Sequence, residues 1–194
     1  MNASELPGKV CCSTHCPSRP DARDELVGSV KRRQAESTTS TSAEGKAFLG
    51  SLPFSIAIRP FGGHVSGPTI RLVHGSHVLN TVYVTEDRSD EFLTTMATGL
   101  GSRAGDVVCF GHTHKPWHRV VDGVHFINTG SVGRPKDGDP RAGYVVLDIT
   151  DSSVTVEFVR IGYDIDEAAS AIIASDLPDE FAEFLRTGGA GSAA

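Results

Sequence analysis

Three short apolar segments that each run directly into a polar turn constrain the fold of this chain more than any other feature. Residues 70–73 lead into His-Gly, residues 107–110 into Gly-His-Thr-His, and residues 124–127 into Asn-Thr-Gly-Ser-Val-Gly. Four-residue segments with three or four apolar residues, bounded by turn-forming residues, are typical of buried β-strands. Because functional side chains in open α/β sheets gather where strands end, this pattern predicts a sheet with a polar site at one edge.

The remaining periodicity predicts the other elements of a layered α/β fold. Alternation of apolar and polar residues indicates paired strands, and apolar residues three and four apart indicate helices. We expect strands over 55–59, 69–74, 106–110, 117–121, 124–127, 143–149 and 154–161, and helices over 87–100, over 164–174 and from Pro178. An α/β sandwich that is mostly β, with one central and two C-terminal helices, fits this order.

The two ends of the chain differ from its centre. The first 45 residues lack apolar periodicity and contain a hydroxyl run over 37–42, so they predict a poorly ordered arm with a short helix near 43–49. We expect residues 46–187 to form one folded unit. Residues 188–194 are rich in glycine and alanine and predict a disordered tail.

Composition excludes several classes of protein. The formal net charge of -6 argues against a chain built to coat nucleic acid or an anionic membrane surface. No apolar run approaches the ~20 residues that span a bilayer, so we expect no membrane segment. Only four cysteines occur, three of them near the N-terminus, and no export signal precedes them. These features predict reduced thiols and a cytoplasmic protein.

Histidines form the strongest chemical motif. His112 and His114 follow a strand at a spacing that lets both imidazoles project into one pocket, and neutral imidazole is a common ligand of transition metals. Gly111 would let the backbone before them bend or approach a ligand closely. His74 ends a second strand and would lie nearby, although a satisfied strand-end histidine is the alternative. The turn that follows residues 124–127 forms either a tight loop or part of the same pocket.

In order and spacing, these segments resemble the calcineurin-like metallophosphoesterases, specifically their small microbial phosphodiesterase-like branch, over roughly residues 48–186. The resemblance implies a partial two-sheet (α/β/β/α) sandwich of mostly antiparallel strands. It implies hydrolysis of a small phosphate ester and binding of divalent metal, with Mn, Zn, Ni and Fe as the alternatives. It also implies that His74 and His112 ligate one metal and His114 the other. The pocket-lining residues would be Gly111, Asn128 and Ser131.

The chain departs from the family pattern in one respect. It contains no D-x-H motif and no Gly-Asn pair, so the family's bridging aspartate and leaving-group histidine have no counterpart, and the catalytic residues are unassigned. Asp106 lies in a G-D-x-x-x-x-G match, but it begins the strand that His112 ends, about 20 Å away. We therefore expect Asp106 to start or cap the strand. We expect weak binding of about one ion and little or no phosphodiesterase activity.

Other candidate ligands have weaker support. The spacing C-C-x-x-H-C near the N-terminus matches no zinc module, so incidental reduced thiols are the simpler interpretation. The residues of this cluster are Cys11, Cys12, His15 and Cys16. We expect the other histidines to occupy surface or strand positions: His64, His77, His118 and His125.

Three explanations for the incomplete motif set stay open. The chain is a phosphoesterase completed by another chain, a non-catalytic remnant that keeps weak metal binding or an interaction role, or a sequence from whose gene model the preceding half was lost. In each case strands that lack their usual neighbours would leave exposed edges, which favours self-association.

Overall fold

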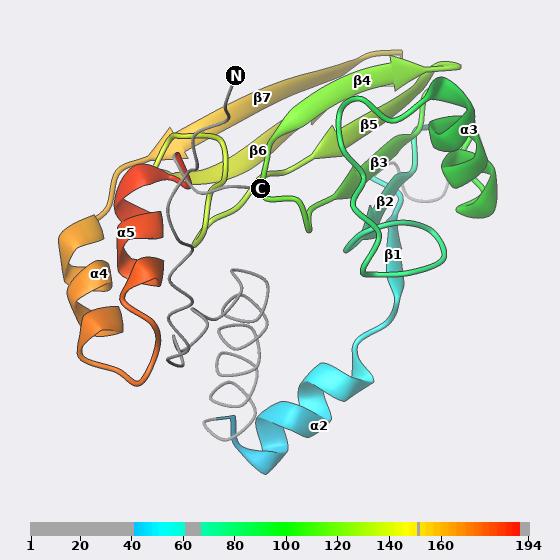
Figure 1. Ribbon diagram of the computed structural model, residues 1–194. Helices are drawn as coiled ribbons and strands as arrows, with labels where there is room; N and C mark the ends of the chain where they lie inside the picture. Colours follow the sequence, from blue (N-terminus) through cyan, green and yellow to red (C-terminus); the bar gives the residue numbers. More distant parts are fainter. Residues whose placement is uncertain (1–40, 61–66, 151, 191–194) are drawn as a thin grey trace, which may run out of the picture.

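The computed structural model describes residues 41–60, 67–150 and 152–190. The cysteine cluster near the N-terminus, His64 and nearly all of the predicted arm lie outside these ranges. Within them the chain forms four helices and two sheets (Figure 1). In chain order the elements are α2 (Ala43–Ser51), β1 (Ser55–Ile58), β2 (Ile70–Val73), α3 (Asp90–Gly99), β3 (Val107–Phe110), β4 (Trp117–Val121), β5 (Val124–Asn128), β6 (Ala142–Ile149), β7 (Val154–Ile161), α4 (Ile165–Ile173) and α5 (Glu180–Thr187).

The larger sheet has the strand order β1-β2-β3-β5-β4, and β6 pairs with β7 in a second sheet. Three of the five strand pairings are antiparallel, as predicted, but β2 with β3 and β3 with β5 are parallel. Parallel neighbours need a crossover connection, and α3 lies in the crossover between β2 and β3. The parallel centre matters for function because it places the carboxyl ends of β2, β3 and β5 at one edge of the sheet.

The central strand β3 is buried along its whole length. Val108 and Phe110 pack toward α3, where Leu93 and Met96 belong to the same apolar cluster. The other two side chains of β3, Val107 and Cys109, face the second sheet. A strand covered on both faces is continuously apolar rather than alternating, which explains the pattern that marked it in the sequence.

Local signals fix several element boundaries. The hydroxyl of Ser89 accepts a hydrogen bond from the Phe92 amide and caps α3, and the Asp164 carboxylate accepts one from the Glu167 amide and caps α4. Asp122 and Gly123 form the two-residue turn between β4 and β5, both with positive φ, as this pair predicts.

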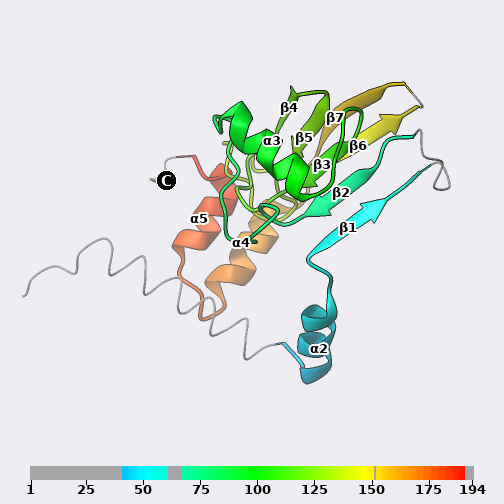
Figure 2. The same cartoon turned by 90° about the vertical axis from the view of Figure 1, so that its right-hand side faces the viewer.

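The C-terminal helices α4 and α5 pack side by side and lie apart from α3 (Figures 1 and 2). Gly188 ends α5 in the left-handed conformation, and its carbonyl accepts a hydrogen bond from the Gly138 amide. Gly188 was predicted to belong to the tail, but here it is held against the loop that precedes β6. None of the helices in the described ranges combines the length and the apolarity needed to cross a membrane.

Candidate functional site

The ends of β2 and β3 bring two histidines together. His74 Nε2 lies 3.1 Å from His112 Nδ1, and the two rings meet edge to face with centroids 5.0 Å apart. The Gly111 amide donates a hydrogen bond to the His74 carbonyl and so continues the pairing of the two strands past their ends. This juxtaposition follows from the parallel pairing of β2 with β3, which aligns their carboxyl ends, as the strand-end argument predicts.

The turn after β3 is strained at its histidines and not at its glycine. His112 and His114 have φ values of 63° and 60°, in the left-handed region that a non-glycine residue rarely occupies. Gly111 is absent from the positive-φ residues, and a Cβ there would meet nothing within 4 Å. The left-handed bend therefore lies at the two histidines, and of the two roles expected for Gly111 a close approach to a ligand stays a prediction. Strain of this kind is concentrated at functional sites, because surrounding contacts must hold it in place.

His114 is oriented by the loop after β5. Its Nδ1 lies 2.7 Å from the Arg134 carbonyl oxygen. A carbonyl can only accept a hydrogen bond, so Nδ1 carries the proton and Nε2 keeps its lone pair. A backbone carbonyl that fixes an imidazole in this way is the usual outer partner of a metal-binding histidine.

His112 has a buried nitrogen without a well-formed hydrogen bond among the described residues. Its Nε2 is shielded from solvent and has no partner there at hydrogen-bonding geometry, although the backbone of Thr81 interacts with the imidazole and raises its pKa. Tyr83 contributes to the shielding, because its ring centroid lies 4.5 Å from that of His112. A buried polar atom without a partner is costly, and a ligand at Nε2 would remove the cost. No motif in the sequence points to Tyr83, so its contact with His112 was not predicted.

Both strained histidines favour the neutral state. Burial is the main cause that lowers the pKa of His112, and the charges of His74 and Lys136 lower it further, against a backbone hydrogen bond with Thr81 that raises it. Burial also lowers the pKa of His114, against the hydrogen bond to Arg134, and the charges of Lys136, Arg134 and His112 add to the effect. Neutral imidazoles keep a lone pair available, which metal binding requires.

Asn128 joins the two turns of the site. This fully buried side chain donates from Nδ2 to the Gly111 carbonyl at 2.9 Å and to the Thr113 hydroxyl at 2.8 Å. Its Oδ1 accepts from the Gly130 amide at 3.0 Å. Asn128 thus supports the turn that carries the histidines.

Ser131 shapes the loop that positions His114. Its hydroxyl accepts a hydrogen bond from the Arg134 amide, and its carbonyl accepts one from the Gly143 amide. The Arg134 guanidinium lies over the rings of Phe184 and Phe181 on α5, at 4.1 and 5.3 Å. The same residue therefore links His114 to α5, a connection that the sequence did not indicate.

These residues limit what metal could bind. Across residues 41–60, 67–150 and 152–190, no three His, Cys, Asp or Glu side chains form a group that could hold a metal ion. His74 and His112 supply a pair of imidazoles, and His114 keeps a free Nε2, but no carboxylate joins them. Two dications need negative ligands to offset their repulsion. The described donors do not fit a carboxylate-bridged pair of metals, and they fit at most one ion held by imidazole nitrogens.

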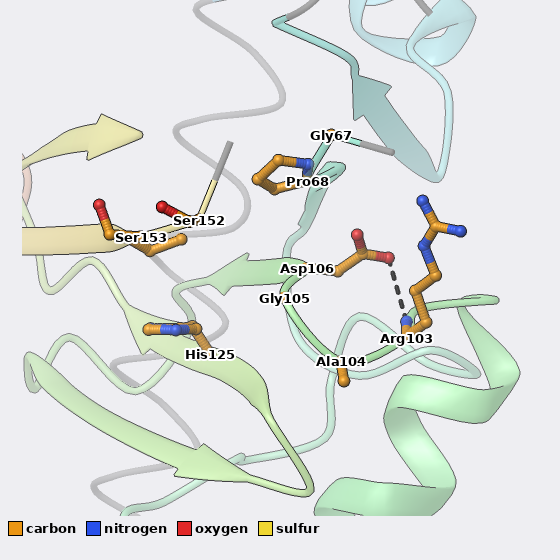
Figure 3. Close-up of a pocket in the computed structure, with 10 residues that line it drawn as sticks. Gly67, Pro68, Arg103, Ala104, Gly105, Asp106, His125, Ser152 and Ser153 are labelled. Atoms are coloured by element: carbon orange, nitrogen blue, oxygen red, sulfur yellow. Dashed lines mark hydrogen bonds between the residues drawn. The ribbon is translucent and has the colours of Figure 1, made fainter. Parts of the chain in front are cut away.

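A cavity lies at the opposite end of β3 (Figure 3). It has a volume of about 380 Å³ and is lined by residues that include Arg103, Asp106, His125 and Ser153. Asp106 accepts hydrogen bonds from the Thr69 and Arg103 amides at 2.8 and 3.0 Å. These bonds confirm that Asp106 caps the strand start.

A second histidine pair lies on β4 and β5. His118 Nε2 and His125 Nδ1 are 3.1 Å apart, and the rings stack with centroids separated by 5.2 Å. Both occupy strands, as predicted, but their contact was missed. Diagonal contacts of this kind depend on strand register, which the letters alone do not give.

The fold is that of a phosphoesterase domain. The family model of the calcineurin-like phosphoesterase superfamily domain matches residues 53–152. The chain belongs to this superfamily, whose members use divalent metal ions.

Three individual proteins illustrate the similarity. An uncharacterised protein of Methanocaldococcus jannaschii is 33% identical over an aligned length of 99, and the match covers 43% of this chain and 40% of that protein. A second match is the crystal structure of a metallophosphoesterase from Sphaerobacter thermophilus, with a TM-score of 0.63 and 25% identity. The superposition covers 78% of this chain and 65% of the Sphaerobacter chain. A hypothetical protein of Pyrococcus horikoshii shares the fold, with a TM-score of 0.61, 20% identity, and coverage of 75% and 55%. The chain thus spans only part of the length of each relative.

Proposed function

We propose that this chain acts in the metal-dependent hydrolysis of phosphate esters, of the phosphodiesterase type. The observation that carries the proposal is the pairing of His74 with His112 at adjacent strand ends. His74 and His112 would supply two imidazole ligands to a divalent ion, with Mn, Zn, Ni and Fe as the alternatives, and His114 would join them only where ligands from outside the described residues complete the site. A divalent ion bound there would act as a Lewis acid toward the phosphate oxygens.

Electrostatics around the histidines suit an anionic ligand. Lys136 is close enough to lower the pKa of both His112 and His114, and Arg134 lowers that of His114. Positive charge disfavours a second dication but attracts a phosphate group, which carries its own negative charge to the metal. The substrate class is therefore a small phosphate ester, and Asn128 and Ser131 act by holding the two turns that face it.

Hydrolysis also needs a base for water and a proton for the leaving oxygen. The chain lacks the D-x-H and Gly-Asn motifs, and its described residues gather no carboxylate beside the histidines. Because residues that act as a unit fail together, we expect this chain by itself to hydrolyse diesters near the background rate. Full activity would require ligands supplied by another polypeptide segment. The cytoplasmic location suggested by the cysteines stays a prediction.

A second candidate function is a non-catalytic module that keeps weak metal binding or an interaction role. The lack of a three-residue metal group in the described part of the chain favours it. The two functions differ in one measurable respect. A phosphoesterase part should gain activity when the missing ligands are restored, whereas a non-catalytic module should not.

The first test is metal stoichiometry. After loading with Mn or Zn and removal of free metal, elemental analysis should give about one ion per chain, because neutral imidazoles leave the repulsion between two dications uncompensated. His112→Ala should abolish binding. His118→Ala is the matched control, since it removes one imidazole of the other hydrogen-bonded pair. Two tightly held ions, or equal loss in both variants, would contradict the proposed site.

The second test is an aryl phosphodiester assay with added Mn. The chain should show near-background hydrolysis, and a fusion that supplies a family D-x-H and G-N-H-D segment should restore it. In that fusion His114→Ala should remove the restored activity. Lack of activity in a folded, metal-loaded fusion would favour the non-catalytic module. Robust turnover by the chain alone, lost in His114→Ala, would show that ligands outside the described residues complete the site.

A further inference from the structure

His114 is held from two sides by one short segment, residues 134–136. Its ring nitrogen Nδ1 lies 2.7 Å from the Arg134 carbonyl oxygen, and its own carbonyl accepts a hydrogen bond from the Lys136 amide at 3.1 Å. His114 has a φ of 60°, a conformation that a non-glycine residue keeps only where surrounding contacts impose it. The geometry of His114 therefore depends on what holds residues 134–136 in place.

Local chemistry restricts the backbone of this segment. The Arg134 amide donates a hydrogen bond to the Ser131 hydroxyl at 2.9 Å. Pro135 is fully buried, and its ring fixes its own φ and disfavours the helical conformation at Arg134. With the backbone restricted on both sides, a contact that fixes the Arg134 side chain also helps to fix the direction of the Arg134 carbonyl.

Helix α5 provides such a side-chain contact. The guanidinium carbon of Arg134 lies 4.1 Å from the ring centroid of Phe184 and 5.3 Å from that of Phe181. A guanidinium within about 6 Å of an aromatic ring centroid is attracted by the negative face of the ring. Phe184 is the nearer ring and therefore contributes the stronger cation–π contact.

The end of α5 contacts the same loop through its backbone. The Gly138 amide donates a hydrogen bond to the Gly188 carbonyl at 2.9 Å. A Cβ at Gly188 would lie 2.6 Å from the carbonyl carbon of Asp139, and a Cβ at Gly189 would lie 3.2 Å from the Cα of Lys136. The backbones approach this closely because neither glycine carries a Cβ. Figure 1 shows α5 beside the loop that connects β5 to β6.

We propose that α5 positions His114 in the candidate site, and that Phe184 and Arg134 are positioning residues. Phe184 holds the Arg134 side chain, the Arg134 carbonyl keeps the proton of His114 on Nδ1, and the lone pair on Nε2 stays available to a ligand. Helix α5 lies beyond residue 152, where the match to the family model ends, so membership of the superfamily does not by itself imply this role. The inference rests on the proposed function only in assigning a ligand to Nε2.

The first measurement is the tautomer of His114 in the full chain, which needs no metal. Nitrogen NMR shifts distinguish Nδ1–H from Nε2–H at a fixed pH of about 8.5, well above the ordinary pKa of histidine. The unsubstituted chain should hold the Nδ1–H form in excess. Phe184→Leu removes the ring but keeps an apolar side chain, and it should lower the ratio of Nδ1–H to Nε2–H by about two- to fivefold, the strength of an exposed cation–π contact.

Phe92→Leu is the matched control. Phe92 lies on α3 under the guanidinium of Arg88 at 5.0 Å, and both Phe92 and Phe184 are half-buried. The same substitution therefore breaks the same kind of contact elsewhere, and it should leave the tautomer of His114 unchanged. Deuterium exchange of the Lys136 amide should accelerate in Phe184→Leu but not in Phe92→Leu. A general loss of stability would instead accelerate exchange at the buried amides of β3 as well.

A double-mutant cycle tests whether Phe184 and Arg134 act through one contact. Arg134→Gln removes the cation but keeps the backbone carbonyl that faces His114. It should shift the tautomer ratio in the same direction as Phe184→Leu, and the double variant should show no more than the larger single effect. Additive effects would overturn the proposal, because the two residues would then act separately. If Phe184→Leu does not fold, Arg134→Gln tests the same contact from the other side.

Zinc affinity separates this inference from the proposed function. If His114→Ala leaves the Zn affinity of the full chain unchanged while Phe184→Leu shifts the tautomer, the positioning role stands and the ligand role of His114 is rejected. Zn binding that weakens in His114→Ala, together with an unchanged tautomer in folded Phe184→Leu and Arg134→Gln, would support the ligand role and overturn the positioning role. An equal shift of the tautomer in Phe92→Leu would overturn it too.

Discussion

At the scale of single residues, the conformation of the site depends on Asn128 more than on Gly111. Asn128 is fully buried and bonds to groups on both turns, whereas a side chain at Gly111 would enter open space. The left-handed conformations of His112 and His114 need such external support, because each costs about 1–3 kcal/mol. The hydrogen bonds of the Asn128 side chain therefore stabilise the turn in which the two histidines adopt these strained conformations.

This difference predicts opposite effects of two alanine substitutions. Asn128→Ala should lower the free energy of unfolding by about 2–4 kcal/mol, because it leaves buried donors and acceptors without partners. Gly111→Ala should change it by less than about 0.5 kcal/mol, or slightly raise it by restricting the unfolded chain. Urea unfolding measures both. A loss of more than 2 kcal/mol in Gly111→Ala would show that this glycine is needed after all.

At the scale of elements, the β4–β5 hairpin creates the second histidine pair. The two-residue turn at Asp122 and Gly123 sets a register in which Val120 lies opposite His125. His118, two residues before Val120, becomes the diagonal neighbour of His125 on the same face. Burial lowers the pKa of both, and for His118 the charge of His125 lowers it further.

The pair therefore predicts an asymmetric response to substitution. His125→Gln should raise the pKa of His118, because a positive neighbour is removed while most of the burial stays. His118→Gln should change the pKa of His125 less, since burial is its only identified cause. Titration of the imidazole signals by NMR measures both values. A pKa of His118 that does not move in His125→Gln would show that burial acts alone.

At the scale of the whole molecule, folding removes protons from four histidines. The pKa values of His112, His114, His118 and His125 are all lowered below 6.5 by burial first. The unfolded chain consequently binds more protons than the folded chain below about pH 6.5, and stability rises with pH wherever that holds. At acidic pH, therefore, all four histidines, two in the candidate site and two in the second pair, lower the free energy of unfolding.

We expect the free energy of unfolding to be highest above about pH 6.5, where these histidines are neutral in both states. It should fall as the pH drops below that value toward 5. Thermal melts across this range measure the effect. The double variant His118→Gln and His125→Gln should show a shallower decline than the unsubstituted chain. Constant stability from pH 7 to pH 5 would contradict the lowered pKa values.

The sequence by itself determined the kinds of element and the residues that could meet at the site. Apolar runs ending in His-Gly and Gly-His-Thr-His identified β2 and β3 with their histidines, and Asp122-Gly123 identified a hairpin, because local backbone preferences act over a few residues. The capped helices α3 and α4 were found for the same reason. The order of the family motifs predicted the superfamily, and the match of the family model confirms it.

Only the tertiary structure decided which residues touch and which surfaces stay exposed. The parallel centre of the sheet, the strain at His112, the link from His114 through Arg134 to α5 and the contact of Tyr83 depend on segments far apart in the chain. The open edge of β1 likewise appears only once the strand order is known. Contacts between distant segments depend on how all elements pack at once, and no short stretch of sequence contains that information.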